Sequence, residues 1–388
     1  MVQTFYRAAR DMGFRSTEER KVHHLRISLE EDVESKASTG FEDVHLIHRC
    51  LPEIDPEEID LKVEFLGHTF KAPLFISAMT GGAPEAKMIN ANLAEAAETL
   101  GLGMCVGSQR AALENSGLED TFSIVRERAP KAFISANIGF MELPRLDEKN
   151  IELLIKMVEA DALTIHLNAL QEMLQYDAKP SFKSLKSSLE SLVRSLDIPV
   201  IVKETGCGIS SEDAAFFEEI GVKALEIAGL GGTSWSAVEY HRNLRMGKMD
   251  LAKVAKTFWD WGIPTVAAIL EARSGSRLPI IASGGIRTGL DVLKALVLGA
   301  RLGGLALPLL RPAIEGPDRL SSFLKNIIEE IKIGLILIGA KKVEEASEKP
   351  FILTGLMAEW KRQRDLIGRK RISPGTLTSV IKEESLDQ

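Results

Sequence analysis

Residues 279–310, PIIASGGIRTGLDVLKALVLGARLGGLALPLL, contain the pattern that decides the fold. A short apolar run ends at the Gly284-Gly285 pair, helical spacing resumes over 291–298, and Gly299 separates that helix from a second apolar run. Two strands that flank one helix within about 30 residues are typical of a parallel crossover. Because glycine lacks a Cβ atom, its backbone N–H groups can approach an anion closely at the start of a helix. We therefore predict a phosphate site at the glycine pair.

Two glycine-rich turns stand one crossover apart in this stretch, SGGIRTG and LGARLGGLA. They resemble the paired phosphate-binding loops after the last two strands of a (β/α)8 barrel, above all of barrels that depend on flavin mononucleotide (FMN). An ordinary strand-to-helix turn with tight packing is the alternative. The spacing of the two turns favours the phosphate loops.

Six further short apolar runs precede this stretch, at residues 73–78, 102–106, 133–136, 162–165, 199–202 and 223–227. Helical segments lie between them, and this alternation predicts an α/β fold with a closed parallel sheet, a (β/α)8 TIM barrel. An open doubly wound sheet is the nearest alternative. It is disfavoured because no GxGxxG turn follows the first strand and because polar clusters follow every strand instead of meeting at one crevice.

The length of 388 residues fits one such barrel with additions at both ends. We predict an N-terminal arm over residues 1–66, an FMN-binding barrel over 67–340, and a C-terminal helical extension over 341–388. A Lys/Glu-rich tail is expected from about Arg369.

The composition is that of an ordinary globular protein, with 45% hydrophobic and 27% charged residues. The net charge of -7 and the lack of an arginine-rich run give no general attraction for nucleic acid. Three widely spaced cysteines without a CxxC pair favour a reducing compartment and disfavour a zinc site. No apolar block of a signal peptide and no run of about 18 apolar residues is found, so we expect a soluble, cytoplasmic protein without membrane contact.

Seven motifs occur in a specific order: RKVHHL in the arm, then AMTGG, GSQR, HLNALQE, KETGCGIS, GLGGTSW and SGGIRTG after successive strands. In a (β/α)8 barrel the loops after the strands meet on one face, so these motifs can form one pocket. Together they resemble the type 2, FMN-dependent isopentenyl-diphosphate delta-isomerase family, over about residues 19–360. No single motif is specific, but the series is.

The resemblance implies a set of site residues. The flavin would contact Ala78, Met79, Thr80, Ser108, Asn137, Lys203, Thr233, Gly284, Gly285, Ile286, Ala306 and Leu307. The substrate, a diphosphate, would contact Arg20, Lys21, His24, Ser108, Gln109, Arg110, His166, Asn168 and Gln171. Catalytic roles would fall to Gln171, Lys203 and Glu239, and Glu172 would bind Mg²⁺ together with diphosphate oxygens.

Physical arguments support some of these roles. Lys203 follows the apolar run PVIV, so its ammonium is expected at the mouth, where it can stabilise negative charge on a reduced flavin. An ion pair with Glu204 is the alternative. Glu172 suits Mg²⁺, which commonly takes one or two carboxylates plus substrate phosphates, although a lone glutamate after a strand is more often a solvated surface residue. His166 by itself fits a buried, hydrogen-bonded histidine as well as a ligand.

The resemblance implies the reversible conversion of isopentenyl diphosphate to dimethylallyl diphosphate in isoprenoid biosynthesis. Reduced FMN would act as acid and base, NAD(P)H would prime the flavin, and the protein would be a homo-oligomer, a tetramer or octamer. One departure is present, because the family usually continues with Gln-Pro-Glu-Gly-Asp where this chain has Gln175 followed by YDAKP over 176–180. The alternatives are an FMN-dependent oxidoreductase on the same barrel and a flavin-binding paralogue without turnover.

Overall fold

Eight parallel strands close into a barrel, as the sequence predicts. The structure is a computed structural model that describes residues 17–369, so most of the predicted tail lies outside the described residues. The strands are β4 (Leu74–Ile76), β5 (Gly103–Cys105), β6 (Ile134–Gly139), β7 (Ala162–Leu167), β8 (Val200–Glu204), β9 (Ala224–Glu226), β10 (Ile280–Ala282) and β11 (Leu302–Leu305). They pair in chain order, and β11 pairs with β4 to close the barrel.

Three strands extend further than the sequence predicts. In the paired region Asn137 of β6 lies opposite Thr164, Gly139 lies opposite His166 of β7, and His166 lies opposite Lys203 of β8. Asn137, His166 and Lys203 were expected in the loops, but they lie within the paired carboxyl-terminal parts of the strands. Their backbones are therefore held by the sheet, which fixes where the side chains start.

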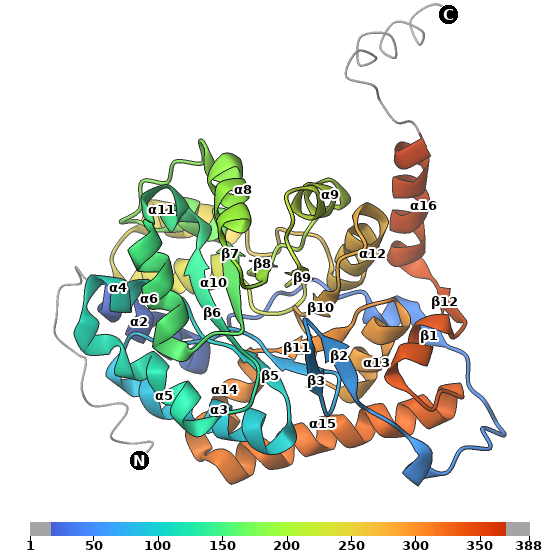
Figure 1. Ribbon diagram of the computed structural model, residues 1–388. Coiled ribbons are helices and arrows are strands. Elements are labelled where there is room, and N and C mark those ends of the chain that lie inside the picture. The colour runs from blue at the N-terminus through green and yellow to red at the C-terminus, as the bar shows by residue number, and fades with distance from the viewer. Residues whose placement is uncertain (1–16, 370–388) are drawn as a thin grey trace, which may run out of the picture.

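Helices surround the barrel, and Figure 1 shows them packed outside the strands. The ring contains α3 (Pro84–Leu100), α5 (Asp120–Arg128), α6 (Glu148–Val158), α8 (Leu185–Ser195), α9 (Ser211–Glu219), α12 (Thr265–Gly275), α13 (Gly289–Val297) and α15 (Pro317–Ile338). Local signals set their ends: Pro84 starts α3 and left-handed Gly101 ends it, while Thr288 and Asp291 form a capping box that starts α13 two residues earlier than predicted.

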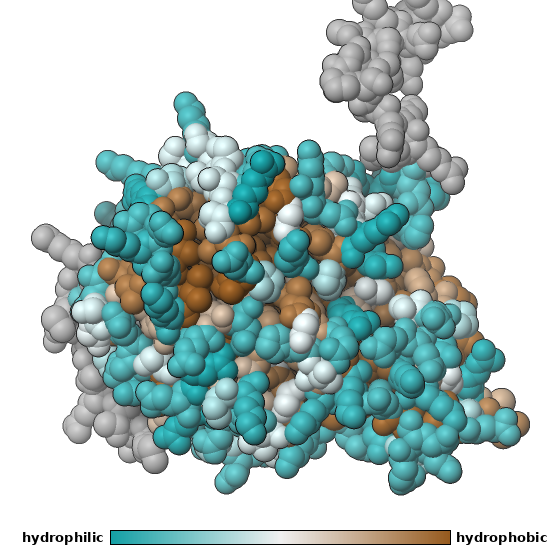
Figure 2. Space-filling view, viewed as in Figure 1, coloured by the Kyte–Doolittle hydropathy of each residue, from teal (hydrophilic) through white to brown (hydrophobic). Residues whose placement is uncertain are grey.

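Apolar side chains fill the interior of the protein, and hydrophilic side chains cover most of its visible surface. Apolar strand and helix residues form one large buried cluster, in which Phe75 and Leu93 are fully enclosed. Hydrophilic residues cover most of the face seen in Figure 2. No helix within residues 17–369 is long and apolar enough to cross a membrane.

A β-hairpin contacts the barrel at the end opposite the polar strand ends. Strands β2 (Val63–Phe65) and β3 (His68–Phe70) pair antiparallel across the turn Leu66-Gly67, both with positive φ. The rings of Phe65 and Phe70 in the hairpin pack against Phe133 edge-on and tilted, with centroids 5.9 and 5.7 Å away. The division predicted at residue 66 falls inside this turn, so the hairpin contributes strands to both predicted parts.

The two additions to the barrel meet each other. Strand β1 (Val44–Leu46) of the arm pairs antiparallel with β12 (Phe351–Leu353), which is followed by α16 (Gly355–Arg369). The arm also contains α2 (Thr17–Glu30), which packs on α4 (Arg110–Glu114), α10 (Trp235–Arg245) and α14 (Leu307–Glu315). Helix α7 (Ala169–Leu174) contacts α10 and α11 (Met249–Thr257). The arm thus covers the end of the barrel where the strands finish.

Candidate active site

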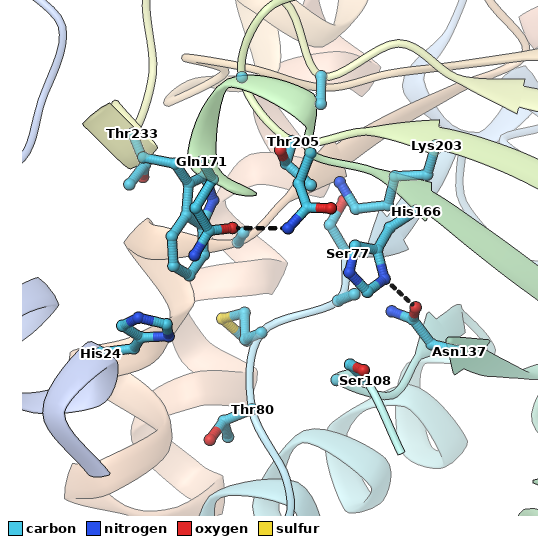
Figure 3. Close-up of a pocket in the computed structure, with 18 of the residues that line it drawn as sticks. His24, Ser77, Thr80, Ser108, Asn137, His166, Gln171, Lys203, Thr205 and Thr233 are labelled. Carbon is cyan, nitrogen blue, oxygen red and sulfur yellow. Dashed lines mark hydrogen bonds between the residues drawn. The ribbon is translucent and has the colours of Figure 1, made fainter. Parts of the chain in front are cut away.

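One cavity lies at the carboxyl ends of the strands, under α2 (Figure 3). The predicted residues that line it are Arg20, Lys21, His24, Ala78, Met79, Thr80, Ser108, Arg110, Asn137, His166, Asn168, Gln171, Glu172, Lys203, Thr233, Gly284, Gly285, Ile286, Ala306 and Leu307. Residues separated by almost 290 positions therefore share one pocket, as expected when barrel loops converge. Glu239 lies directly behind this lining, and Gln109 does not reach it.

Gln109 faces away from the cavity. Its side chain is 0% exposed, its Oε1 accepts a hydrogen bond from the Asn137 backbone N–H at 2.9 Å, and its Nε2 donates to the Leu154 carbonyl at 3.0 Å. Ser108 and Arg110 on either side line the cavity. The structure therefore does not bring the Gln109 side chain into the cavity with its neighbours, because both ends of its amide are bound to backbone groups of β6 and α6.

A cationic cluster occupies the α2 side of the cavity. Lys21 Nζ donates to the Ser108 carbonyl at 2.9 Å, and Arg20 Nη1 donates to Gln175 Oε1 at 2.9 Å. Arg110 forms ion pairs with Glu114 and Glu142, at 2.8 and 2.9 Å, and keeps its positive charge. Burial, and then the charges of Arg20 and Arg110, lower the pKa of Lys21 to about 7. An anionic ligand would relieve this repulsion, so the cluster suits a diphosphate.

His166 lies between this cluster and Lys203. Its Nδ1 is 2.8 Å from Asn137 Oδ1, and because an amide oxygen only accepts, Nδ1 carries the proton. Figure 3 marks this hydrogen bond with a dashed line. Burial, and then the charges of Lys21 and Lys203, lower the pKa of His166 to about 3. Gly139 allows this position, because a Cβ there would lie 3.0 Å from His166 Nε2. The imidazole is neutral unless an anion binds beside it.

The floor of the cavity contains a buried ion pair that the sequence did not reveal. Lys203 Nζ lies 3.2 Å from Glu226 Oε1, which also accepts a hydrogen bond from Ser283 Oγ at 3.0 Å. Lys203 touches Glu204 only through the Glu204 backbone carbonyl, at 2.8 Å, so the alternative ion pair is not the one formed. Glu226 is 1% exposed and stands within an otherwise apolar strand. A lone acid in such a run was the available signal.

Several polar groups of the cavity have no partner within the protein. Among the described residues, Ser77 Oγ, Asn168 Oδ1 and Glu226 Oε2 are buried without a hydrogen bond, and all three residues line the cavity. Buried polar atoms are normally satisfied, so these atoms fit a ligand rich in donors and acceptors, such as a flavin ring and its ribityl chain.

The Gly284-Gly285 loop and the start of α14 offer a site for the phosphate group of such a ligand. Gly284 and Gly285 have φ of 98° and 74°, and a Cβ on Gly285 would lie 2.4 Å from the Gly231 carbonyl, so two loops meet here only because both positions are glycine. The capping box occupies the start of α13, but no side chain caps α14, whose first residues Ala306 and Leu307 line the cavity. An uncapped helix start beside glycine loops suits an anion.

Gln171 lines the side of the cavity beneath α2, and the buried Glu239 lies behind it. Gln171 Nε2 and His24 Nε2 lie 3.0 and 3.1 Å from Glu239 Oε1, and Asn168 Nδ2 donates to Gln171 Oε1 at 3.0 Å. Burial raises the pKa of Glu239, but the hydrogen bond and charge of His24, then Arg242 and Gln171, outweigh it and lower the pKa below its ordinary value. The amide of Gln171 is thus fixed at both ends.

Comparisons with known proteins agree with this geometry. A family model described as FMN-dependent dehydrogenase matches residues 27–135 and 140–352. Proteins named isopentenyl-diphosphate delta-isomerase are similar over most of their length. The chain is 44% identical to the one from Methanosarcina barkeri over 350 residues (90% of this chain, 95% of the relative). It is 46% identical to that of Archaeoglobus fulgidus (89% and 98%) and 48% identical to that of Methanoregula boonei (88% and 95%).

The chain belongs to the type 2 isopentenyl-diphosphate delta-isomerase family. The family predicted from the ordered motifs is thus confirmed, as is the dependence of the family on FMN. Solved structures similar to this isomerase-family chain share its fold at low identity. The flavin-binding domain of baker's yeast flavocytochrome b2 matches with a TM-score of 0.63 and 18% identity, over 92% of this chain and 89% of that one. Mandelate oxidase with (S)-2-phenylpropionate matches with a TM-score of 0.58 and 18% identity, over 86% and 95%.

The segment that departs from the isomerase family motif contacts the site. Gln175 accepts from Arg20, and the Asp177 carboxylate accepts from Arg242 of α10, with Nη2 2.8 Å from Oδ2. The Arg242 guanidinium lies 4.6 Å from the centroid of the Tyr176 ring. Arg242 was not predicted, because nothing in the α10 sequence separates it from a surface arginine.

Proposed function

We propose that this protein reversibly converts isopentenyl diphosphate to dimethylallyl diphosphate, with reduced FMN and Mg²⁺. The observation that supports this best is that one cavity joins a cationic cluster, a polar floor and the Gln171–Glu239 pair. The cationic cluster suits the diphosphate, and the short carbon chain would then extend toward Gln171. The relatives named isopentenyl-diphosphate delta-isomerase support the same reaction.

The residues of the floor and the glycine loops would hold FMN. Lys203 would lie at the polar edge of the ring, Asn137 and Ser108 beside the ring and ribityl chain, and the Gly284-Gly285 loop with the start of α14 at the phosphate. Bound in its reduced form, FMN supplies an acid and base group and a negatively charged ring that stabilises positive charge on the substrate. NAD(P)H as its reductant is part of the proposal.

Mg²⁺ would arrive with the substrate. Within residues 17–369 no group of three or more His, Cys, Asp or Glu side chains could hold a metal ion. Glu172 lines the cavity, and its Oε1 accepts a hydrogen bond from Asn168 Nδ2 at 3.0 Å. One carboxylate together with diphosphate oxygens and water is a common Mg²⁺ environment. Glu172 would therefore bind the metal only when the diphosphate is present.

The protein's own groups would control protons and water around the carbon chain. Gln171 has no accessible charge near neutral pH, so it would orient a donor or acceptor rather than ionise. Glu239 would hold the Gln171 amide in one orientation by accepting the hydrogen bond from its Nε2. Helix α2 would exclude water from the cavity, which strengthens every charge interaction inside. A cytoplasmic location and a homo-oligomeric state are also proposed.

The test is anaerobic incubation of the purified protein with isopentenyl diphosphate, FMN, Mg²⁺ and dithionite, followed by product analysis. We expect dimethylallyl diphosphate to form, and its formation to stop when the flavin is oxidised or Mg²⁺ is removed by a chelator. Equal activity of oxidised protein without reductant contradicts the proposal. Stoichiometric NAD(P)H consumption with a keto acid or quinone would instead indicate an oxidoreductase.

A further inference from the structure

Arg242 is a buried cation behind the wall of the cavity. It is 2% exposed, and its guanidinium reaches two carboxylates on opposite sides. Nη1 lies 3.2 Å from Glu239 Oε2, and the Asp177 oxygens accept from Nη1 at 3.3 Å and from Nη2 at 2.8 Å. The Tyr176 ring covers one face at 4.6 Å. A buried guanidinium in this arrangement has fixed position and orientation, because charge, fork geometry and stacking all agree.

Arg242 contacts the carboxylate oxygen of Glu239 that the cavity residues do not use. Glu239 is 0% exposed, and its other oxygen is bound by Gln171 and His24. His24 of α2 and Arg242 of α10 are the titratable groups that face this carboxylate. Burial lowers the pKa of His24 more than its hydrogen bond with Glu239 raises it. Arg242 is therefore the partner that stays charged at every working pH.

The segment after α7 holds Arg242 and reaches the diphosphate end as well. Gln175 accepts from Arg20, and the next two residues, Tyr176 and Asp177, contact Arg242. Asn243 of α10 donates to the Leu174 carbonyl at 2.9 Å, which ties the start of the segment to the same helix. Tyr176 replaces the proline of the family motif, and only an aromatic ring can stack on the guanidinium here.

We propose that Arg242 is the positioning residue of Glu239, and that Tyr176 and Asp177 clamp Arg242 so that Glu239 holds Gln171 in its working orientation. Arg242 touches neither substrate nor cofactor and acts through Glu239. The inference rests on the proposed isomerase function. The loop that departs from the family motif therefore supports the proton-transfer side of the cavity instead of disabling it.

The experiment measures kcat/KM against pH for the holoenzyme with reduced FMN, Mg²⁺ and isopentenyl diphosphate, in the wild type and in Arg242→Gln, Arg242→Lys and Asp177→Asn. Arg194→Gln, which removes a surface arginine paired with Glu190, is the matched control and keeps the wild-type profile. In Arg242→Gln, loss of the positive charge should raise the pKa of Glu239. The acidic limb of the kcat/KM profile should then move to higher pH by about one unit or more, because an opposite charge at this distance lowers a carboxyl pKa by about 1–3 units. Arg242→Lys should keep the limb in place and lower kcat at least about tenfold, since a lysine keeps the charge but not the fork.

Asp177→Asn should lower kcat without moving the acidic limb of the pH profile, because it weakens the contact that holds the Arg242 guanidinium in place and keeps the charge of Arg242. An unchanged limb in Arg242→Gln together with wild-type kcat in Arg242→Lys overturns the inference. If Arg242→Gln does not fold, the lysine and Asp177 variants decide, and wild-type kcat in both overturns it. A wild type that is inactive with reduced FMN overturns the proposed function, whereas an active wild type with insensitive variants overturns only the role of Arg242.

Discussion

Removing the acid of the buried Lys203–Glu226 pair should destabilise the protein strongly when no flavin is bound. The two groups lie 3.2 Å apart, with side chains 9% and 1% exposed, so water screens neither charge. Glu226→Gln leaves the Lys203 ammonium without its counter-charge, and breaking a buried pair from one side costs about 3–5 kcal/mol. The matched control Glu190→Gln breaks a pair whose acid is 39% exposed, and it should cost at most about 1 kcal/mol.

The assay is urea unfolding of the apoprotein and of the protein saturated with reduced FMN. A negatively charged flavin beside Lys203 supplies a second counter-charge, so the loss in Glu226→Gln should be clearly smaller with the flavin than without it. If Glu226→Gln lowers the free energy of unfolding of the apoprotein by less than about 1 kcal/mol, the ion pair does not stabilise the floor of the cavity. An equal loss with and without reduced flavin would refute the placement of the ring next to Lys203.

Three further predictions concern residues in or behind the wall of the cavity. Burial depresses the pKa of Lys21 to about 7, so above that pH the folded apoprotein binds fewer protons than the unfolded chain. Its free energy of unfolding should therefore rise from pH 7 toward pH 10. Urea titrations of Lys21→Met should show a flatter rise. Gln109→Leu should lower the free energy of unfolding by about 1–3 kcal/mol and leave KM for the diphosphate unchanged. A raised KM would show that Gln109 contributes to substrate binding. Gly139→Ala places a Cβ 3.0 Å from His166 Nε2 and should reduce turnover while circular dichroism and thermal midpoint stay close to wild type; full activity would show that the imidazole can shift freely.

The barrel and most of the cavity lining were predictable, because apolar runs mark the strands and the first polar residues after them must lie at the mouth. The direction of each side chain was not predictable in the same way. Gln109 stands between two cavity residues, yet its amide is bound by the Asn137 backbone and the Leu154 carbonyl. A strand-end pattern reveals neither partner, because one belongs to strand β6 and the other to helix α6.

Two charged residues were missed for a related reason. In the sequence Glu226 is one residue of an apolar run, and its importance comes from Lys203, which lies opposite it on the neighbouring strand. Arg242 looks like a surface residue of an amphipathic helix until Asp177 and Glu239 are placed on either side of it. Buried ion pairs between elements distant in sequence depend on how those elements pack in the folded protein, and the spacing of residues within one element does not predict that packing.

The pairing of β1 with β12 has a consequence for the order in which the molecule is completed. A ribosome releases the arm first, but the strand that fastens it, Phe351–Leu353, emerges only after all eight barrel strands have been made. Until then β1 has no strand to pair with, although α2 can already pack on α4, α10 and α14. The pairing of β1 with β12 is therefore the last strand pairing that synthesis allows, and it joins the arm to the C-terminal extension once the barrel is complete.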